Sequence, residues 1–476
     1  MNANVMKKLC AILGILFVFT VLLASAVFAE ETAAPAEPPK IDTGDTTFVL
    51  ISAALVMLMT PGLALFYGGM VRTKNVLSTI MQSFICLGII SIQWVLWGYS
   101  LAFGPDINHL IGSLDWIGLN GVGVDPNADY SATIPQYAFM IFQGVFAIIT
   151  PAIIAGSVGE RVKFPAYIAF VLLWATFVYD PVAHWVWGVG GWLRENGVLD
   201  FAGGTVVHII SGVSGLVFAL MIGKRKGYGS EVMAPHHLPM TVLGAALLWF
   251  GWYGFNAGSA LGASGLAVAA FVTTHTAAAA ATVSWVFAEW LYHGKPTLLG
   301  AASGCIAGLV VITPAAGFVS IMSALIMGLL GGVICFFSVA VAKTKLGYDD
   351  SLDAFGVHGV GGTFGAIATG IFASTAVNPA GADGLLTGNA SQVVSQIIGA
   401  GTCWLFAAVM TFIIVKFIGL FMQITADAEQ QVQGMDITEH GERGYAYQDL
   451  ITGSPLSIPV TGFSNEQVAV KKTTLA

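Results

Sequence analysis

Residues 200–226 read DFAGGTVVHIISGVSGLVFALMIGKRK. Between 201 and 223 the only ionisable side chain is His208, and the run is long enough for a helix to cross the hydrocarbon core of a bilayer. Three basic residues, 224–226, follow it at once. This stretch therefore predicts a membrane-spanning helix that holds a histidine inside the bilayer.

Similar apolar runs recur along the whole chain. Hydrophobic residues make up 56% of the sequence and charged residues only 9%, whereas a soluble domain carries about 25% charged residues. So few charges exclude a soluble fold of this size, and no basic patch suggests nucleic-acid binding. The fold class expected is an all-α polytopic membrane protein with eleven transmembrane helices. The spans are expected near 47–71, 77–103, 136–158, 164–183, 201–223, 238–258, 262–290, 298–313, 318–342, 354–375 and 392–421.

Basic residues orient this bundle, because lysine and arginine collect in cytoplasmic loops. They follow the first, third, fifth, seventh and ninth spans, while the opposite loops 104–135, 184–199 and 376–391 contain only Arg194. The expected domains are a membrane domain, 47–422, and a cytoplasmic C-terminal tail, 423–476. This places a multi-pass protein in the cell membrane, with its mature N-terminus outside.

The N-terminus has the pattern of a secretory signal peptide. Lys7 and Lys8 precede an apolar stretch, and small residues stand at the −3 and −1 positions of a cleavage site after Ala29. We therefore expect a cleavable signal peptide, 1–29, followed by a flexible external segment, 30–46. An uncleaved first helix is the alternative.

Two motifs occur twice, and five spans separate the members of each pair. His208 and His358 both open the pattern H-x-x-x-G-x-x-G, and Thr-Pro-Ala occurs at 150–152 and 313–315. An odd number of spans gives the two halves opposite orientations, so a five-plus-five inverted repeat is predicted. Such repeats place a shared site near the bilayer midplane.

A single histidine inside a membrane is most often a packing residue, and His275, which has no repeat partner, is interpreted in that way. His208 and His358 differ, because the pseudo-symmetry brings them together. Two neutral imidazoles offer a hydrogen-bond donor and an acceptor to a passing molecule, or relay a proton. Asp200 and Asp353 precede these spans and are interpreted as helix caps, with a lesser electrostatic role for Asp200.

Aromatic side chains cluster toward the predicted outer side of the bundle. Phe142 and Phe146 lie one helical turn apart, Trp187 lies beyond the fourth span, and Trp252 and Phe255 lie near the end of the sixth. They are compatible with an interfacial belt or with a cage that binds a cation through ring faces. The nearby hydroxyl of Ser259 would suit the cage, but the residues alone leave both interpretations open.

Longer strings resemble a known family. DFAGGTVVH at 200–208, GWYGFNAGSA at 251–260 and FGVHGVGG at 355–362 are similar to signatures of the Amt/MEP/Rh ammonium transporter family, in its prokaryotic Amt branch. The resemblance extends from about 47 to 447 and ends in HGERGYAY, at 440–447. The loop between Trp187 and Asp200 is one residue longer than the family pattern, and 448–476 match no motif.

The resemblance implies an external ammonium-recruitment site at Phe146, Trp187 and Ser259, with Phe142 and Trp252 as neighbours that complete the substrate-binding set. It implies a homotrimer with one pore in each subunit. It also implies that HGERGYAY couples subunits and that a PII-type signal protein can dock at the cytoplasmic face.

Within the pore, the resemblance implies a gate of two stacked rings, Phe146 and Phe255, above the twin histidines His208 and His358. Asp200 would have a structural and electrostatic role near the outer site. No cofactor and no metal is expected, and no catalytic residue is assigned.

The predicted function is that of an ammonium channel or transporter: ammonium is recruited, loses a proton and crosses as ammonia, with or without the proton. Methylammonium would serve as an analogue. An ammonium sensor on the same scaffold is the main alternative. An enzyme is disfavoured because no HExxH, GxSxG or metal-spaced ligands occur, and passage of another small neutral molecule, such as carbon dioxide, is disfavoured by the cation cage.

Overall fold

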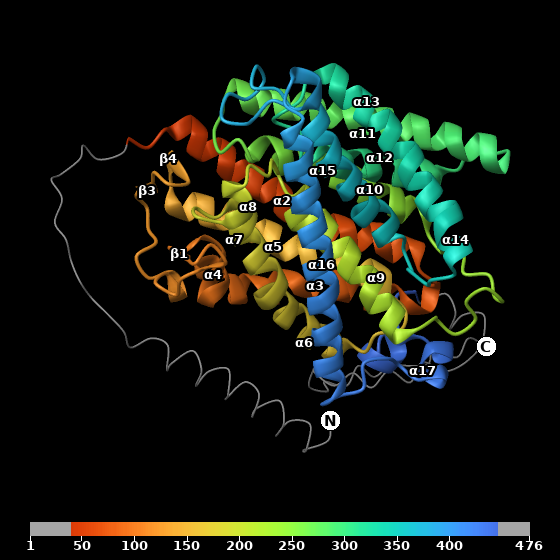
Figure 1. Cartoon of the computed structure of the whole chain (residues 1–476). Coiled ribbons are helices and arrows are strands. Elements are labelled where there is room, and N and C mark those ends of the chain that lie inside the picture. Colours follow the sequence, from red (N-terminus) through yellow and green to blue (C-terminus); the bar gives the residue numbers. More distant parts are fainter. Residues whose placement is uncertain (1–39, 446–476) are drawn as a thin grey trace, which may run out of the picture.

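Helices dominate the computed structural model, which describes residues 40–445 (Figure 1). In chain order they are α2 (Thr43–Met70), α3 (Val76–Gln93), α4 (Tyr99–Phe103), α5 (Gln136–Val158), α6 (Phe164–Trp174), α7 (Asp180–Trp187), α8 (Trp192–Glu195), α9 (Ile210–Ile222), α10 (Leu238–Gly258), α11 (Gly265–His293), α12 (Leu298–Ile312), α13 (Ile321–Phe337), α14 (Lys343–Leu346), α15 (Val360–Phe372), α16 (Ser391–Gly419) and α17 (Ala428–Gln433). The predicted signal peptide, 1–29, and the end of the tail, 446–476, lie outside the described residues.

Several of these helices continue through π-helical segments. Three such segments join α3 to α4, α6 to α7 and α13 to α14: Trp94–Gly98, Ala175–Tyr179 and Ser338–Ala342. Two more lead into α9 and α15, and another follows α17: Gly204–Ile209, Phe355–Gly359 and Asp436–His440. Two small antiparallel hairpins, β1 (Asp106–Ile107) with β2 (Ile111–Gly112) and β3 (Pro126–Asn127) with β4 (Ser131–Pro135), lie between α4 and α5.

Between residues 40 and 445, ten helical stretches are long and apolar enough to cross a membrane, and the shorter apolar helix α12 has 15 residues. All eleven predicted spans coincide with one of these helices, with ends that differ by a few residues. The fourth span, for example, continues through α7 and ends at Trp187 rather than before it. Pro181 does not interrupt the helix, because the π-helical segment Ala175–Tyr179 directly before it locally changes the hydrogen-bond pattern and accommodates the missing N–H.

The chain becomes helical earlier than the predicted flexible segment, 30–46, allows. α2 begins at Thr43, because the side chain of Asp42 accepts a hydrogen bond from the backbone N–H of Asp45 at 2.9 Å. An aspartate that accepts this bond is a strong helix start signal.

The two halves of the repeat cross where small residues let the backbones approach. Gly212 on α9 packs directly on the backbone of Gly359, and Gly362 on α15 packs on Gly204 and on the Cβ of His208. A side chain at Gly212 would overlap that backbone, so the glycines of the H-x-x-x-G-x-x-G motifs permit the close crossing. This crossing brings the two histidines into the same region of the bundle.

The ends of the bundle differ in chemistry. We call one end the basic end, because the loops after α2, α5 and α9 place Arg72, Arg161 and Arg225 there. α14 and α17 lie at this end, and the hairpins gather at the opposite end, which we call the vestibule end (Figure 1). The long helix α16 connects the two ends across the front of the view.

Candidate functional site

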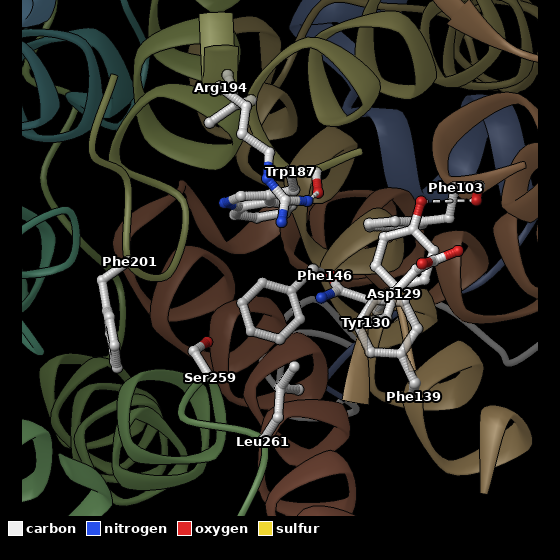
Figure 2. Close-up of a pocket in the computed structure, with 12 residues that line it drawn as sticks. Phe103, Asp129, Tyr130, Phe139, Phe146, Trp187, Arg194, Phe201, Ser259 and Leu261 are labelled. Atoms are coloured by element: carbon white, nitrogen blue, oxygen red, sulfur yellow. Dashed lines mark hydrogen bonds between the residues drawn. The ribbon is translucent and has the colours of Figure 1, made fainter. Parts of the chain in front are cut away.

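An aromatic cavity of about 210 Å³ opens at the vestibule end, and we call it the vestibule. Phe146 on α5, Trp187 at the last position of α7 and Ser259 just after α10 all line it. In Figure 2, Arg194 and Trp187 lie at one edge of the space and Ser259 and Leu261 at the other, with Phe146 between them. Three of the predicted recruitment residues, from distant parts of the chain, therefore meet at one cavity.

Hydrogen bonds hold these side chains in place. The Phe146 and Trp187 rings stand edge to face, with centroids 6.0 Å apart and planes at 89°. The indole N–H of Trp187 donates to the backbone oxygen of Asp200 at 2.9 Å. The hydroxyl of Ser259 donates to the backbone oxygen of Phe255 at 2.9 Å, which leaves the lone pairs of its own oxygen available to a bound cation.

Two residues of the predicted substrate-binding set do not line the vestibule. Phe142 is fully buried behind Phe146, with ring centroids 5.0 Å apart, and packs against Gly258. Trp252 lies deeper, where its ring stacks on His208 at 5.4 Å and its N–H donates to the hydroxyl of Thr313. Both side chains support the site from behind rather than form its wall.

Below the vestibule two phenyl rings close the way inward. Phe146 and Phe255 have centroids 4.2 Å apart and planes tilted by 37°, and both are buried. Phe146 lines the vestibule, while Phe255 lines the next cavity inward. This ring pair therefore separates the two spaces, in the position expected of a gate.

The next cavity is a narrow, mostly apolar space of about 10 Å³ that contains the two histidines. A third cavity of about 10 Å³ shares Phe66, Ile306 and His358 with it and continues past Tyr67 and Asp353 toward the basic end. We call these two spaces the conduit. Each part has room for little more than one small molecule.

His208 and His358 meet in the conduit with their Nδ1 atoms 3.2 Å apart. One Nδ1 must donate and the other must accept, so the two rings carry opposite tautomers when both are neutral. One Nε2 is then an acceptor and the other an N–H donor. The Nε2 of His208 is buried and has no hydrogen-bond partner among residues 40–445.

Each histidine lies on a π-helical turn that a carboxylate caps. Asp200 accepts the backbone N–H groups of residues 203–206 and the hydroxyl of Thr205. At the other histidine the corresponding residue is Asp350, whose side chain accepts the N–H groups of Ala354 and Phe355. Both aspartates precede their histidine by eight residues, and this spacing is a signal that sequence reasoning missed.

The predicted cap Asp353 has a different role. Its backbone is in the left-handed region at φ 63°, and its carboxylate pairs with Lys343 at 2.6 Å. It also lines the inner part of the conduit. The prediction of a cap at Asp353 is therefore wrong, because the turn of the chain before α15 aims Asp350 rather than Asp353 at the free N–H groups.

The remaining intramembrane histidine, His275, is not a buried packing residue. It lies on the exposed surface of α11, where its Nδ1 is 2.7 Å from the hydroxyl of Tyr253 on α10. Its ring also lies 5.7 Å from that of Trp249. This pair forms a polar spot on an otherwise apolar helix face.

Sequence reasoning did not identify several residues of the vestibule wall. They come from loops and from helix faces without a recognisable motif: Phe103, Asp129, Tyr130, Phe139, Gln143, Val186, Arg194, Phe201 and Leu261. The guanidinium of Arg194 donates to the backbone oxygen of Trp187 at 2.8 Å. Asp129 places a carboxylate at the exposed rim.

A network of buried ion pairs connects the loops at the basic end. Arg225 donates to Asp349 through Nε and Nη2, one edge of its guanidinium, at 2.7 to 3.1 Å, and through Nη1 to Glu160 at 2.8 Å. Glu160 further accepts from Arg72 and Asn75. Every one of these charges has a fixed partner of opposite sign or a hydrogen bond.

Burial and pairing shift the titration of this network in opposite directions. Burial alone would raise the pKa of Glu160, but the charges of Arg225 and Arg72 and their hydrogen bonds outweigh it and hold the pKa below its usual value. The pKa of Asp349 is lowered in the same way, with Arg225 as the main partner against burial. Burial lowers the pKa of Arg161 to about 10.

The C-terminal segment packs onto this end. The carboxylate of Asp436 accepts the N–H groups of Leu77 and Ser78 at the start of α3, and Glu439 accepts the N–H of Phe164 at the start of α6.

Within the described part of the chain, no group of three or more His, Cys, Asp or Glu side chains is arranged to hold a metal ion.

Known proteins share this sequence and fold. The model of the Ammonium Transporter Family matches residues 47–445. An ammonium transporter of Bacillus subtilis (strain 168) is 57% identical over 406 residues, which are 85% of this chain and 99% of that protein. A putative ammonium transporter of Methanothermobacter thermautotrophicus is 50% identical over 407 residues, again 85% of this chain and 99% of that protein.

Several solved structures have a similar fold. Saccharomyces cerevisiae Mep2 is similar with a TM-score of 0.77 at 36% identity, covering 82% of this chain and 89% of that one. The structure of a protein named "Sensor Amt Protein" is similar with a TM-score of 0.76 at 28% identity, covering 83% and 98%. The relatives of this chain are transporters rather than enzymes, and the chain is a multi-pass membrane protein that belongs to the ammonium transporter family.

Proposed function

We propose that the chain recruits ammonium in the vestibule, removes one proton near the Phe146–Phe255 ring pair and conducts ammonia past His208 and His358. One observation carries the proposal most directly. A vestibule with aromatic walls, a closed ring pair and a narrow apolar conduit with two imidazoles follow one another through the bundle.

The vestibule suits a small cation. Trp187 and Phe146 present aromatic surface to the same space as the Ser259 hydroxyl. Ring faces attract a cation by about 2 kcal/mol when water is excluded, and the hydroxyl oxygen accepts one N–H bond. Bare alkali-metal ions gain less, since they have no N–H group to donate to that oxygen.

The conduit suits only a neutral molecule. Moving an ion into a medium of low dielectric costs on the order of 20 kcal/mol in the idealised case, and filters that pass ions replace the lost hydration with rings of carbonyl oxygens. The side chains around the histidines are mainly hydrocarbon, such as Ile149, Ile153 and Leu248. Ammonia keeps a lone pair and three N–H groups, so it can use the donor and acceptor that the paired imidazoles present.

Replacing His208 with Ala tests this proposal. Losing one hydrogen-bonding group of the conduit should slow methylammonium uptake about tenfold, the effect of about 1.4 kcal/mol. Uptake and current are recorded together in proteoliposomes at several pH values, which also shows whether the proton crosses. His293→Ala, at the exposed end of α11, is the matched control. Unchanged uptake, current and ion selectivity in His208→Ala would remove the histidines from the mechanism.

We further propose eleven spans, with α12 as the short eighth one, and a homotrimer. The Tyr253–His275 pair supports the trimer, because polar side chains exposed at membrane depth are costly in lipid and are best covered by protein. The arginines of the basic end support a cytoplasmic orientation for that end in the cell membrane. PII-type docking there is a secondary proposal. A sensor role is not favoured over transport, because the similar curated proteins are named ammonium transporters and one structurally similar protein is named a sensor.

A further inference from the structure

We propose that His109 is a pH-sensitive positioning residue for Trp187, which holds this part of the vestibule wall in place in acid and lets it loosen in alkali. The inference rests on the proposed function, since it assumes that ammonium binds beside Trp187. It concerns two segments that meet at the vestibule end, 102–109 and 184–192, and we call the contact between them the latch.

One half of the latch is buried and fixed. His184 lies on α7 three residues before Trp187, and both of its ring nitrogens have partners. Nδ1 lies 3.0 Å from the backbone oxygen of Ala102, and Nε2 lies 2.8 Å from Oδ1 of Asp106. The side chain of His184 is fully buried, so water does not compete for these contacts. Asp106 therefore binds the helical turn that leads to Trp187.

The other half of the latch is exposed. The second carboxylate oxygen of Asp106, Oδ2, accepts the backbone N–H of His109 at 3.0 Å. The ring Nδ1 of His109 lies 2.6 Å from the backbone oxygen of Gly190, three residues after Trp187. Trp187 therefore lies between two points at which the latch holds the chain.

Glycines let the backbone after Trp187 pack directly on the latch. A Cβ atom at Gly188 would lie 2.6 Å from Nδ1 of His184, and one at Gly190 would lie 2.7 Å from the Cβ of Asp106. No side chain separates the two segments here. In such close packing, a shift of one segment displaces the other.

The backbone position of His109 is unusual for its residue type. Asn108 and His109 form the two-residue turn between β1 and β2, with φ of 54° and 64°. Glycine is preferred at the second position of such a turn, because a side chain is strained at positive φ. The turn itself does not explain a histidine there, whereas the contacts of its ring with the latch do.

Three acceptors around one nitrogen make the latch sensitive to pH. Besides Gly190, the carboxylates of Glu195 and Asp106 lie 3.4 and 3.8 Å from Nδ1 of His109. The Gly190 carbonyl and these two charges raise the pKa of His109 against an opposing effect of burial. Burial would raise the pKa of Asp106, but the hydrogen bond from His184 and the N–H of His109 outweigh it and lower that pKa. Asp106 thus stays ionised where histidine titrates.

The direction of this shift sets the sign of the effect. A histidine whose pKa is raised by a contact supports that contact fully below its unfolded value of about 6.5, and the support is lost as the pH rises through the folded value. The latch should therefore hold Trp187 in acid and loosen in alkali. Simple charge repulsion has the opposite sign, because a protonated His109 near the vestibule would repel a substrate cation in acid.

The half-saturating concentration of methylammonium at different pH values tests the latch. It is measured in proteoliposomes from about pH 5.5 to about 8.5, with the same pH on both sides, and is expressed as the concentration of the protonated amine. His109→Gln keeps a donor for Gly190 but cannot become charged. His293→Gln, at the exposed end of α11, is the matched control.

We expect the half-saturating concentration of the unchanged protein to rise about threefold over this range, since exposed charge pairs have small effects. In His109→Gln it should stay near the alkaline value at every pH, while His293→Gln should keep the rise. Glu195→Gln, which removes one of the two carboxylates, should make the rise smaller. In Trp187→Leu the concentration should be higher at every pH and the rise should be absent, because the latch acts through this ring.

A rise that persists in His109→Gln, or the absence or reversal of the rise in the unchanged protein, would overturn the latch. If His109→Gln does not reach the membrane, Glu195→Gln decides, since an unaltered rise in it contradicts the proposal. Trp187→Leu shows which idea has failed. If it weakens binding while His109→Gln keeps the rise, recruitment stands without the latch. If it has no effect at any pH, recruitment beside Trp187 is itself wrong.

Discussion

The two ends of the bundle handle positive charge in opposite ways. At the basic end, Arg225 has two fixed carboxylate partners, Glu160 and Asp349, at distances from 2.7 Å. The vestibule offers a cation only ring faces and neutral oxygens in its interior, and its single carboxylate, Asp129, stands at the exposed rim. Conduction requires binding that is favourable enough to admit a substrate and weak enough to release it. Carboxylates therefore suit Arg225, whose charge stays in place in the folded protein, and aromatic rings suit a substrate cation that binds and leaves.

Between these ends the conduit holds no fixed charge pair apart from Asp353 and Lys343 at its inner mouth. Its polar groups are the two imidazoles, which pair with each other through Nδ1. The molecule therefore separates three tasks along one axis. The vestibule attracts a cation, the conduit passes a neutral molecule, and the ion pairs of the basic end stabilise the fold.

Replacing Arg225 with Met tests the ion pairs of the basic end and should have the largest effect. It leaves Glu160 and Asp349 buried without their main partner, which costs about 3–5 kcal/mol. We expect a clear fall in the melting temperature and in the yield of folded protein in detergent. Lys224→Met removes the same charge at an exposed neighbouring site and should change little. Equal stability of the two variants would mean that the network does not stabilise the folded protein.

Acid should weaken the same network. Because the pKa values of Glu160 and Asp349 are lowered in the folded protein, they stabilise it fully above their unfolded values of about 4 and lose this effect as the pH falls through their folded values.

Glu160→Gln should therefore be less stable than the unchanged protein at pH 7, and the difference should shrink below about pH 4. Thermal melting across this range checks it, with Glu429→Gln on the exposed surface of α17 as the control. A difference that stays constant with pH would show that the carboxylate of Glu160 contributes through shape rather than charge.

The vestibule rim should show the smallest effect. Asp129→Asn should raise the half-saturating ammonium concentration by at most about twofold at low salt, because exposed charges are weak and screened. The change should vanish at high ionic strength. Asp115→Asn, exposed in the same long loop but outside the vestibule wall, is the matched control. A large, salt-independent effect would place the Asp129 carboxylate in the binding site. The two ends would then no longer differ in how they bind positive charge.

Part of the candidate site could be predicted from the sequence, because it is repeated. His208 and His358 stand at equivalent positions of two halves, and their glycines fit a close helix crossing. The same repeat contained Asp350, which lies eight residues before its histidine as Asp200 does. It was missed because Asp353 stands closer to the span, and only the hydrogen bonds that Asp350 accepts from Ala354 and Phe355 show which carboxylate faces the helix.

The vestibule wall could be predicted only in part. Tyr130, Gln143 and Phe201 carry no motif and come from separate segments of the chain. The expected neighbours Phe142 and Trp252 are on the right helices but point behind the ring pair and into the conduit. Which face of a helix meets a cavity depends on how neighbouring helices pack, and apolar helices give little amphipathic pattern to show it.

The sequence by itself determined that this chain crosses a membrane many times and that a pair of histidines lies within the bilayer, because long uncharged runs and a doubled motif are properties of the chain. Only the tertiary structure decided that the imidazoles touch, that a ring pair lies above them and that Gln143, with its unpaired amide oxygen, belongs to the vestibule wall. The physical reason is that hydrophobicity acts over each span separately, whereas a site forms from contacts between residues far apart in the chain.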